Sequence, residues 1–245
     1  MKIIGVIPAR YTSTRFIGKP LVDIAGKSMI QRVCEQAKKS KSLSDVIVAT
    51  DDARIKKHVN TFGGNVIMTK KSHRSGTDRC FETIEKYTGS ADVVINIQGD
   101  EPFIHPEQID LLASCFDSNK VQIGTLVKKI NDYDDLFNIN IPKVILNKNK
   151  EAIYFSRQTI PFIREQKKTD WLNYQTFYKH IGIYGYTVQT LSEITTLKPS
   201  SLELAEGLEQ LRWIENGYKI KVEITDLESV AIDVPNDLKK LIKFL

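Results

Sequence analysis

The sequence predicts an α/β fold: a mostly parallel sheet flanked by helices, with a smaller mixed-sheet lobe. The first observation is an apolar, β-branched run at 2–7, followed by a polar loop and a helix-like segment at 28–39. The second is that this strand-then-helix unit recurs three times, which is typical of parallel strands covered on both faces. The third is a change of rhythm after Leu126, where strand-like runs follow one another without long helices.

Hydrophobic spacing assigns the individual elements. The segment 28–39 has the spacing of a helix, with apolar residues at Met29, Ile30, Val33 and Ala37. The three recurrences pair a strand with a helix at 45–50 and 52–62, 65–69 and 77–87, and 92–98 and 106–116. Later strands are expected at 143–147, 151–157, 180–188 and 219–225, with helices at 201–218 and after Pro235. The chain is therefore predicted to be a single domain, 1–245, with a lobe inserted at about 127–190.

The composition is that of a globular protein with a substantial core, since 41% of the 245 residues are hydrophobic and 27% are charged. The chain opens on Lys2, no apolar leader follows, and no stretch approaches membrane-spanning length, so we expect a cytoplasmic protein without a membrane partner. Cys34, Cys80 and Cys115 lie far apart, which indicates buried thiols rather than disulfides or a zinc site. The net charge of +5 suits an anionic partner, either nucleic acid or a phosphorylated small molecule.

The loop at 8–19 follows the first predicted strand, where parallel sheets bind ligands. Its cations, Arg10, Arg15 and Lys19, can neutralise a polyphosphate, and Gly18 lets a phosphate approach the backbone. It is not a Walker P-loop, because Pro20 follows Gly18-Lys19, and the Rossmann glycine pattern is also absent. A solvated basic loop is the alternative interpretation.

The stretch IPARYTSTRFIGKPL closely resembles the N-terminal signature of the 3-deoxy-manno-octulosonate (Kdo) cytidylyltransferases. The likeness continues through VATDD, HRSGTDR, NIQGDEP, YFSRQTIP, KHIGIYGY, LEQLRWIENGY and IDVPNDL, and so spans nearly the whole chain. The resemblance implies a fold of the nucleotide-diphospho-sugar transferase type. It also implies an Mg²⁺-dependent homodimer that transfers CMP from CTP to Kdo and releases pyrophosphate, for lipopolysaccharide biosynthesis.

Carboxylates stand where a metal ion would be needed. Asp100 and Glu101 directly follow an apolar run, and Asp233 ends another. Mg²⁺ typically takes one or two protein carboxylates together with phosphate oxygens and water. Taken without the resemblance, a strand-end Asp is more often a turn former or helix cap. The resemblance implies the pair Asp100 and Asp233 as metal ligands, although Ala231 stands where relatives usually have Gly.

The resemblance also implies the residues that bind CTP and act on it. The CTP-binding set is Ala9, Arg10, Arg15, Lys19, Arg74, Ser75 and Gly76. Arg74 stands where many relatives carry Gln, and its donors suit the acceptors O2 and N3 of cytosine. From the residues alone, Ser75 is a helix cap. In catalysis the anomeric hydroxyl of the sugar attacks the α-phosphorus in line, Lys19 and Mg²⁺ stabilise the developing charge, and Arg10 and Arg15 hold the pyrophosphate.

For the acidic sugar the resemblance nominates Gln98, Arg157, His180, Tyr184, Glu209 and Gln210. Each has a structural alternative: Arg157 as a surface strand end, His180 as a packed core histidine, and Glu209 and Gln210 as a solvated helix face. The aromatic-rich runs IYFSR and FYKHIGIYGY are implied to form the dimer interface.

Three other functions stay open at this point. The same chemistry on a related acidic sugar, such as 8-amino-3,8-dideoxy-octulosonate, is the nearest. A nucleic-acid-binding module is favoured only by the basic charge, because the lysines are scattered and no RRM, KH or helix-turn-helix signature is present. A non-catalytic nucleotide sensor is disfavoured by the presence of Lys19, Asp100 and Asp233 together.

Overall fold

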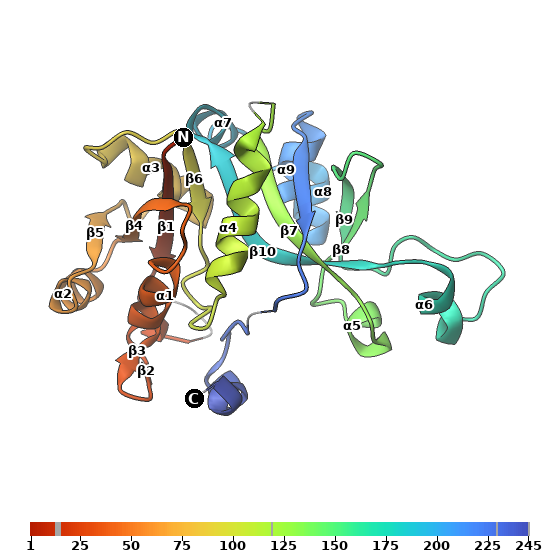
Figure 1. The fold of residues 1–245 in the computed structure, drawn as a ribbon, viewed down its shortest axis with the longest axis horizontal. Helices are drawn as coiled ribbons and strands as arrows, with labels where there is room; N and C mark the ends of the chain where they lie inside the picture. Colours follow the sequence, from red (N-terminus) through yellow and green to blue (C-terminus); the bar gives the residue numbers. More distant parts are fainter. Residues whose placement is uncertain (13–15, 119, 229, 245) are drawn as a thin grey trace.

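One sheet runs through the protein, described here from a computed structural model that covers residues 1–12, 16–118, 120–228 and 230–244 (Figure 1). Along its main path the strand order is β11-β7-β10-β6-β1-β4-β5, and within this path of described strands only β10 runs opposite to the others. The predicted α/β fold with a mostly parallel sheet is therefore confirmed. The strands are β1 (Ile3–Ala9), β4 (Leu43–Thr50), β5 (Asn65–Met68), β6 (Val93–Asn96), β7 (Ile123–Lys129), β8 (Lys143–Leu146), β9 (Ala152–Ser156), β10 (Tyr178–Thr187) and β11 (Ile220–Ile224), with a separate hairpin β2 (Asp23–Ile24) and β3 (Lys27–Ser28).

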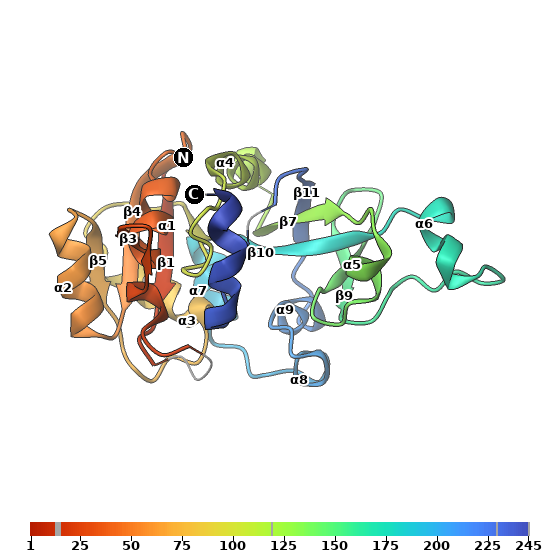
Figure 2. The same ribbon diagram turned by 90° about the horizontal axis from the view of Figure 1, so that it is seen from below.

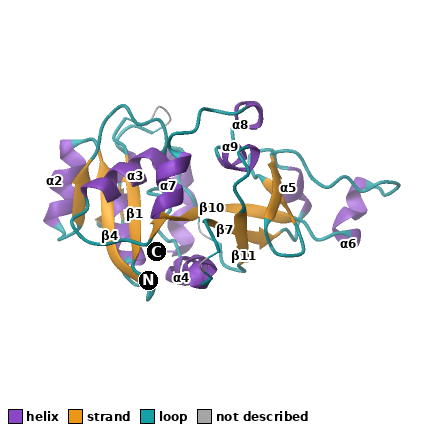
Figure 3. Cartoon of the chain, turned by 90° about the horizontal axis from the view of Figure 1, so that it is seen from above, coloured by secondary structure: helices purple, strands orange, loops and turns teal. Residues whose placement is uncertain are grey.

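Helices cover both faces of the sheet, as Figure 3 shows. On one face α1, α2 and α4 pack their apolar residues on the strands, and on the other face α3, α7 and α9 do so. This double cover explains the continuous apolar runs in the strands. The helices are α1 (Met29–Ala37), α2 (Ala53–Thr61), α3 (Gly76–Lys86), α4 (Pro106–Ser114), α5 (Tyr133–Phe137), α6 (Trp171–Tyr174), α7 (Val188–Ile194), α8 (Ser201–Glu206) and α9 (Gln210–Glu215), with 3₁₀ turns η1 (Lys19–Leu21), η2 (Cys115–Asp117), η3 (Lys168–Asp170) and η4 (Pro235–Phe244).

The first strand is longer than the sequence predicts, because β1 continues through Pro8 to Ala9. Pro8 lacks an N–H, yet its neighbour on one side, β6, ends its ladder at the pair Val6 and Asn96. On the other side the pairing with β4 continues from Pro8 opposite Ala49. Pro8 is tolerated here because no strand lies beside it on the β6 side to need the missing donor.

The single helix expected over 201–218 is wrong. Gly207 ends α8 in the left-handed region with φ +63°, and its N–H bonds to the carbonyl of Glu203 at 2.7 Å. Glycine reaches this conformation at little cost, so the chain turns and begins again as α9 at Gln210. The final helix does open at Pro235, but as the tighter 3₁₀ type. The three cysteines are buried, as predicted.

The segment 130–178, which we call the arm, links β7 to β10. Within it β8 and β9 form an antiparallel pair that branches from the first half of β10. Figure 1 shows α6 and the adjoining loop projecting from the body of the protein. A small apolar cluster of Ile130, Leu136, Trp171 and Phe177 packs within the arm. The division into one domain with an inserted lobe at about 127–190 stays a prediction. Among the described residues no helix is both long and apolar enough to cross a membrane.

Candidate active site

Lys19, Asp100 and Asp233 meet at the ends of β1 and β6. The Nζ atom of Lys19 donates to Oδ2 of Asp100 at 2.8 Å and to the backbone carbonyl of Ile232 at 2.8 Å, and it lies 3.8 Å from Oδ1 of Asp233. The segment after β11 is drawn into this place because the Ile232 N–H bonds to the Asp100 carbonyl at 2.9 Å. Figure 2, in which the molecule is seen from below, shows η4 in dark blue at the end of the sheet where β1 finishes. Three residues nominated from the sequence are thus brought together.

Gly99 explains how Asp100 comes so close to the opening loop. A Cβ atom at this position would lie 2.6 Å from the backbone carbonyl oxygen of Pro8, a distance that real side chains do not tolerate. Only glycine therefore lets the chain after β6 pass against the end of β1. The NIQGDEP motif owes its glycine to this contact.

The opening loop is held by contacts of its own. The Gly18 N–H bonds to the Tyr11 carbonyl at 2.9 Å, and Gly18 has φ +70° just before Lys19. The guanidinium carbon of Arg54 lies 3.3 Å from the Tyr11 ring centroid, and Arg54 is itself paired with Asp52 at 2.7 Å. These contacts anchor both ends of the loop around Lys19. The nominated Arg15 lies outside the described residues, as do Ser13 and Thr14 of the same loop.

Ala9 and Arg10 lie at the end of β1. Arg10 contacts His73, which directly precedes the loop 74–76. Ala9 is buried, and a guanidinium nitrogen of Arg10 donates to the backbone carbonyl of His73. Burial lowers the pKa of Arg10 from its usual value, and the nearby positive charge of Arg79 lowers it further. A bound anion would offset the repulsion between Arg10 and Arg79, and the binding of CTP by Arg10 stays a prediction.

Ser75 begins α3 with a capping box, which confirms the cap predicted from the sequence. Its hydroxyl accepts from the Asp78 N–H at 3.1 Å, and the Asp78 carboxylate accepts from the N–H groups of Ser75 and Arg74 at 3.1 and 3.2 Å. A Cβ at Gly76 would lie 3.4 Å from Nδ2 of Asn96, at the end of β6. The loop 74–76 is therefore held by hydrogen bonds with Asp78 and lies against the same strand ends as Arg10.

Gln98, His180 and Tyr184 cluster on and beside β10. The side-chain nitrogen of Gln98 donates to the Gly182 carbonyl at 2.6 Å. The Nε2 atom of His180 lies 3.0 Å from the Thr125 hydroxyl, and the rings of His180 and Tyr184 are 5.1 Å apart. Burial lowers the pKa of His180 to about 3, so the imidazole is neutral at pH 7. His180 is nevertheless half-buried and lines a cavity, so the alternative of a packed core histidine is wrong.

Glu209 and Gln210 do not form a solvated helix face, so that alternative is wrong. Gln210 is buried, and Oε2 of Glu209 accepts from the Thr77 hydroxyl at 2.9 Å. Burial raises the pKa of Glu209 above its usual value. The break at Gly207 turns the start of α9 inward, against α3 and the loop 74–76.

Arg157 lies at the C-terminal end of α8. Its Nε donates to the Glu206 carbonyl at 2.7 Å, and its N–H bonds to Oε2 of Glu206 at 3.0 Å. Further nitrogens lie 3.3 and 3.4 Å from the carbonyls of Ile139 and Gly207. The guanidinium thus joins the arm to α8, and a role in sugar binding stays a prediction.

A cavity of about 240 Å³ adjoins the Lys19 cluster. It is lined by Glu101, Asn140, Ile141, Pro142, Lys179, His180, Ile181, Gly182, Glu228 and Ala231. Sequence reasoning missed Lys179 and Glu228, whose Nζ and Oε1 atoms are 2.5 Å apart. Lys179 stands beside His180 in the KHIGIYGY motif, but no local pattern marks Glu228 as its partner.

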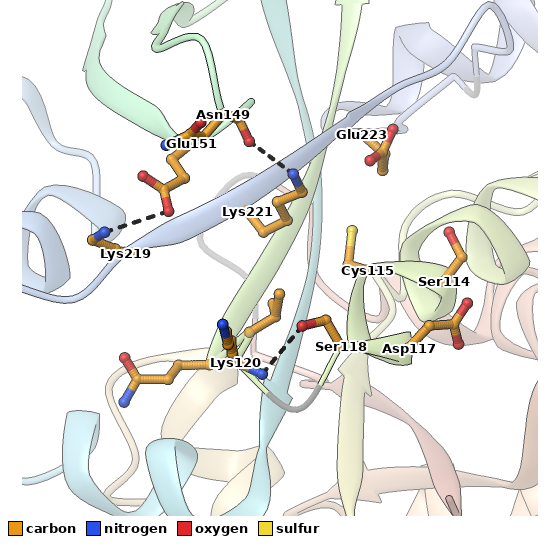
Figure 4. Close-up of a pocket in the computed structure, with 12 residues that line it drawn as sticks. Ser114, Cys115, Asp117, Ser118, Lys120, Asn149, Glu151, Lys219, Lys221 and Glu223 are labelled. Atoms are coloured by element: carbon orange, nitrogen blue, oxygen red, sulfur yellow. Dashed lines mark hydrogen bonds and ion pairs between the residues drawn. The ribbon is translucent and has the colours of Figure 1, made fainter.

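A larger pocket of about 420 Å³ lies away from these residues (Figure 4). It opens at the start of β11, beside Lys219 and Lys221, whereas the candidate site is at the carboxyl ends of β1 and β6. Lys221 already donates to the Asn149 carbonyl at 2.8 Å, and Lys219 is 3.5 Å from Glu151. None of the nominated site residues lines this pocket, so size alone does not identify the site.

The carboxylates of Asp100 and Asp233 fit a hard divalent cation such as Mg²⁺. Both face the ammonium group of Lys19, so the fold already places positive charge between them. In the part of the chain that the structure describes, no group of three or more His, Cys, Asp or Glu side chains forms a metal cage. Phosphate oxygens and water would have to complete the coordination, which is the usual arrangement for Mg²⁺.

Comparison with known proteins gives a consistent assignment. A family model described as cytidylyltransferase matches residues 4–221. The chain is 60% identical over 249 residues to the 3-deoxy-manno-octulosonate cytidylyltransferase of Parabacteroides distasonis, covering 100% of this chain and 98% of the relative. It is 56% identical over 248 residues to the protein of that name from Bacteroides thetaiotaomicron, with the same coverage. A solved structure of CMP:2-keto-3-deoxy-manno-octonic acid synthetase complexed with CTP matches with a TM-score of 0.91 at 39% identity, covering 100% of this chain and 98% of that one. The chain therefore belongs to the 3-deoxy-manno-octulosonate cytidylyltransferases, a family of nucleotidyltransferase enzymes.

Proposed function

We propose that this protein transfers CMP from CTP to Kdo, producing CMP-Kdo and pyrophosphate for lipopolysaccharide biosynthesis in the cytoplasm. The observation that carries the proposal is the convergence of Lys19, Asp100 and Asp233 between the loop 74–76 and the cavity beside His180. The names of the relatives and the CTP complex of the solved structure support the choice of nucleotide and sugar.

The chain's own residues would act by positioning and by charge. The anomeric hydroxyl of the sugar loses its proton to water and its oxygen bonds to the α-phosphorus, while the bond from that phosphorus to the bridging β-phosphate oxygen breaks and pyrophosphate leaves. Lys19, held on η1 after Gly18, is placed to stabilise the charge that develops on the phosphoryl oxygens. Arg10 and Arg15 bind the leaving pyrophosphate, and the loop 74–76 holds cytosine and ribose.

Asp100 and Asp233 would hold Mg²⁺ in the working complex. When bound, the ion neutralises phosphate charge and fixes the geometry of the triphosphate. Asp100 and Asp233 lie 2.8 and 3.8 Å from Lys19, the cation that would face the same phosphates. The two acids would therefore orient Lys19 as well as provide metal ligands.

The sugar would bind next to the cavity beside His180, because His180 lines that cavity while the other nominated sugar-binding residues lie outside its lining. Gln98, Tyr184, Glu209 and Gln210 supply donors and acceptors for its hydroxyls, and Arg157 supplies a cation for its carboxylate. Lys179 and Glu228 line the same cavity, so an amino group in place of a hydroxyl would meet charged neighbours there.

The protein is proposed to act as a homodimer through the arm. Large apolar side chains are exposed along it, with Phe162 at 71%, Tyr174 at 61% and Ile139 at 58% of their full exposure. A projecting segment with such a surface is typical of an interface. Sedimentation of the wild type and of a Phe162→Glu variant tests this, with a dimer expected for the first and a weakened dimer for the second.

The decisive assay is pyrophosphate release with each of the four nucleoside triphosphates, with and without Kdo and Mg²⁺. We expect release only when CTP, Kdo and Mg²⁺ are all present. Equal rates with all four nucleotides, or release that does not need the sugar, would contradict the proposal. A panel of acidic sugars that includes the 8-amino analogue then decides between Kdo and its relatives.

A further inference from the structure

The carboxylate of Glu82 is buried beside the segment 70–73, which leads into the loop 74–76, and 6% of its side chain is exposed. Its Oε2 atom accepts from the Lys70 N–H at 2.8 Å and bonds to Nε2 of His73, while Oε1 is 2.7 Å from the Lys86 ammonium. Burial by itself would raise the pKa of Glu82, but Lys86, the Lys70 N–H and His73 outweigh it and lower the pKa to about 2. Glu82 is thus a charged acceptor with several donors around it.

These contacts continue from Glu82 to Arg10. The His73 ring bonds to Glu82, and the backbone carbonyl of the same His73 accepts from the Arg10 guanidinium. Two hydrogen bonds therefore connect a carboxylate on α3 to a cation at the end of β1. Because the guanidinium donates to this carbonyl, the position of the carbonyl helps to set the direction in which Arg10 points.

A second side chain of α3 holds the start of the same segment. Arg79, fully buried, donates to the Thr69 hydroxyl and to Oδ2 of Asp51, the latter at 3.1 Å. Arg79 therefore fixes Thr69, the first residue of segment 69–73, to α3. Glu82 fixes Lys70 and His73 of the same segment. Arg79 is built into the core, whereas Glu82 controls the part that touches Arg10.

We propose that Glu82 is a positioning residue for the nucleotide site, which holds segment 70–73 so that Arg10 and the loop 74–76 are aimed at CTP. The inference rests on the proposed function, in which Arg10, Arg74, Ser75 and Gly76 bind the nucleotide. Among the described residues, the hydrogen-bond and ion-pair partners of Glu82 are Lys70, His73 and Lys86, and none of these lines the cavity beside His180. Loss of the carboxylate should therefore weaken nucleotide binding and base selection and leave sugar binding unchanged.

The test compares Glu82→Gln with Glu85→Gln, which alters an exposed carboxylate on the same helix. Glutamine keeps the size of the side chain but replaces one acceptor oxygen by a donor and removes the charge. We expect the Kd and KM for CTP to rise about tenfold in Glu82→Gln, the scale of losing one good charge-assisted hydrogen bond. The preference for CTP over UTP should fall, the KM for Kdo should stay as in the wild type, and Glu85→Gln should match the wild type throughout.

A double-mutant cycle with Arg10→Ala shows whether Glu82 acts through Arg10. In the Arg10→Ala background we expect Glu82→Gln to have little further effect on CTP affinity, because coupled residues are not additive. Full additivity, or a wild-type Kd for CTP in Glu82→Gln, would overturn the inference. If Glu82→Gln does not fold, His73→Phe removes the ring contact but keeps the carbonyl, and the same outcomes apply to it. If the wild type binds no CTP, the proposed function itself is overturned. If the wild type binds CTP and Glu82→Gln binds it equally well, only the role of Glu82 is overturned.

Discussion

The ammonium nitrogen of Lys19 lies 2.8 Å from Oδ2 of Asp100, so the opening loop and the segment after β6 share one ion pair. The side chains are 14% and 26% exposed, which leaves the pair less screened than an ion pair on the surface. Each residue is therefore oriented by the other. Substituting either changes the electrostatic environment of the second, and the predictions for the two must be tested separately.

Asp100→Asn should abolish the joint stabilisation of the fold by CTP and Mg²⁺. In the wild type we expect the rise in Tm with both ligands to exceed the sum of the separate rises, because a metal bound by Asp100 and Asp233 would link the protein to the phosphates. Thermal unfolding with each ligand combination measures this. Asp117→Asn, an exposed carboxylate beside the pocket in Figure 4, serves as the control. Strictly additive shifts in the wild type would count against a shared site.

Lys19→Ala should lower kcat and kcat/KM together by ~10²-fold or more, the scale for losing one preorganised donor to a developing charge. Arg15→Ala should act mainly by raising the KM for CTP, because a cation on the leaving pyrophosphate binds the ground state and the transition state alike. Steady-state kinetics of pyrophosphate release separates the two effects. A Lys19→Ala enzyme with a normal kcat and only a raised KM would make Lys19 a binding residue.

Arg157→Lys should raise the KM for the sugar by about tenfold while the KM for CTP stays nearly unchanged, because lysine lacks the planar fork that pairs with a carboxylate. The variant should also have a lower Tm, since the guanidinium bonds to the Glu206 carbonyl at 2.7 Å. Arg164→Lys is the matched control, as Arg164 is 89% exposed in the arm. An equal loss of affinity for both substrates would show that Arg157 serves only to hold the arm to α8.

The free energy of unfolding should fall as the pH drops below about 6.5, because of His180. Its pKa is lowered by burial from the usual 6.5 to about 3, so between these values the unfolded chain binds a proton that the folded chain does not. Above pH 6.5 the histidine is neutral in both states, and below that pH protonation stabilises the unfolded chain and lowers the free energy of unfolding. At pH 5 the loss is about 2 kcal/mol.

Urea unfolding at pH 7.5 and pH 5 checks this expectation. In a His180→Gln variant, which has no group titrating at this position, the decrease between the two pH values should be smaller by that amount. His105→Gln, outside the candidate site, should keep the wild-type decrease. The same pH dependence in His180→Gln and the wild type would rule out His180 as its source.

Local patterns predicted the first four strand–helix pairs, the strands β8 to β11, the burial of the cysteines and the Ser75 cap, but they missed β7 and the helices α5, α6 and α7. The predicted features depend on residues near each other in the chain, where hydrophobic spacing and cap preferences act directly. The extension of β1 through Pro8 was not predictable in this way, because it depends on where the ladder of β6 ends. The end of α8 at Gly207 could not be predicted from the sequence, because a glycine within helical spacing ends some helices and not others.

By itself the sequence determined the class of fold and, through its ordered motifs, the family; the tertiary structure alone decided which side chains meet. Lys19 and Asp100 are 81 positions apart, and the close passage of Gly99 against Pro8 brings them together. Likewise the bonds from Glu82 through His73 to Arg10 join α3 to β1, and no spacing in the sequence marks them. The physical reason is that periodicity reports which face of an element is buried, whereas a site depends on how the ends of separate strands pack.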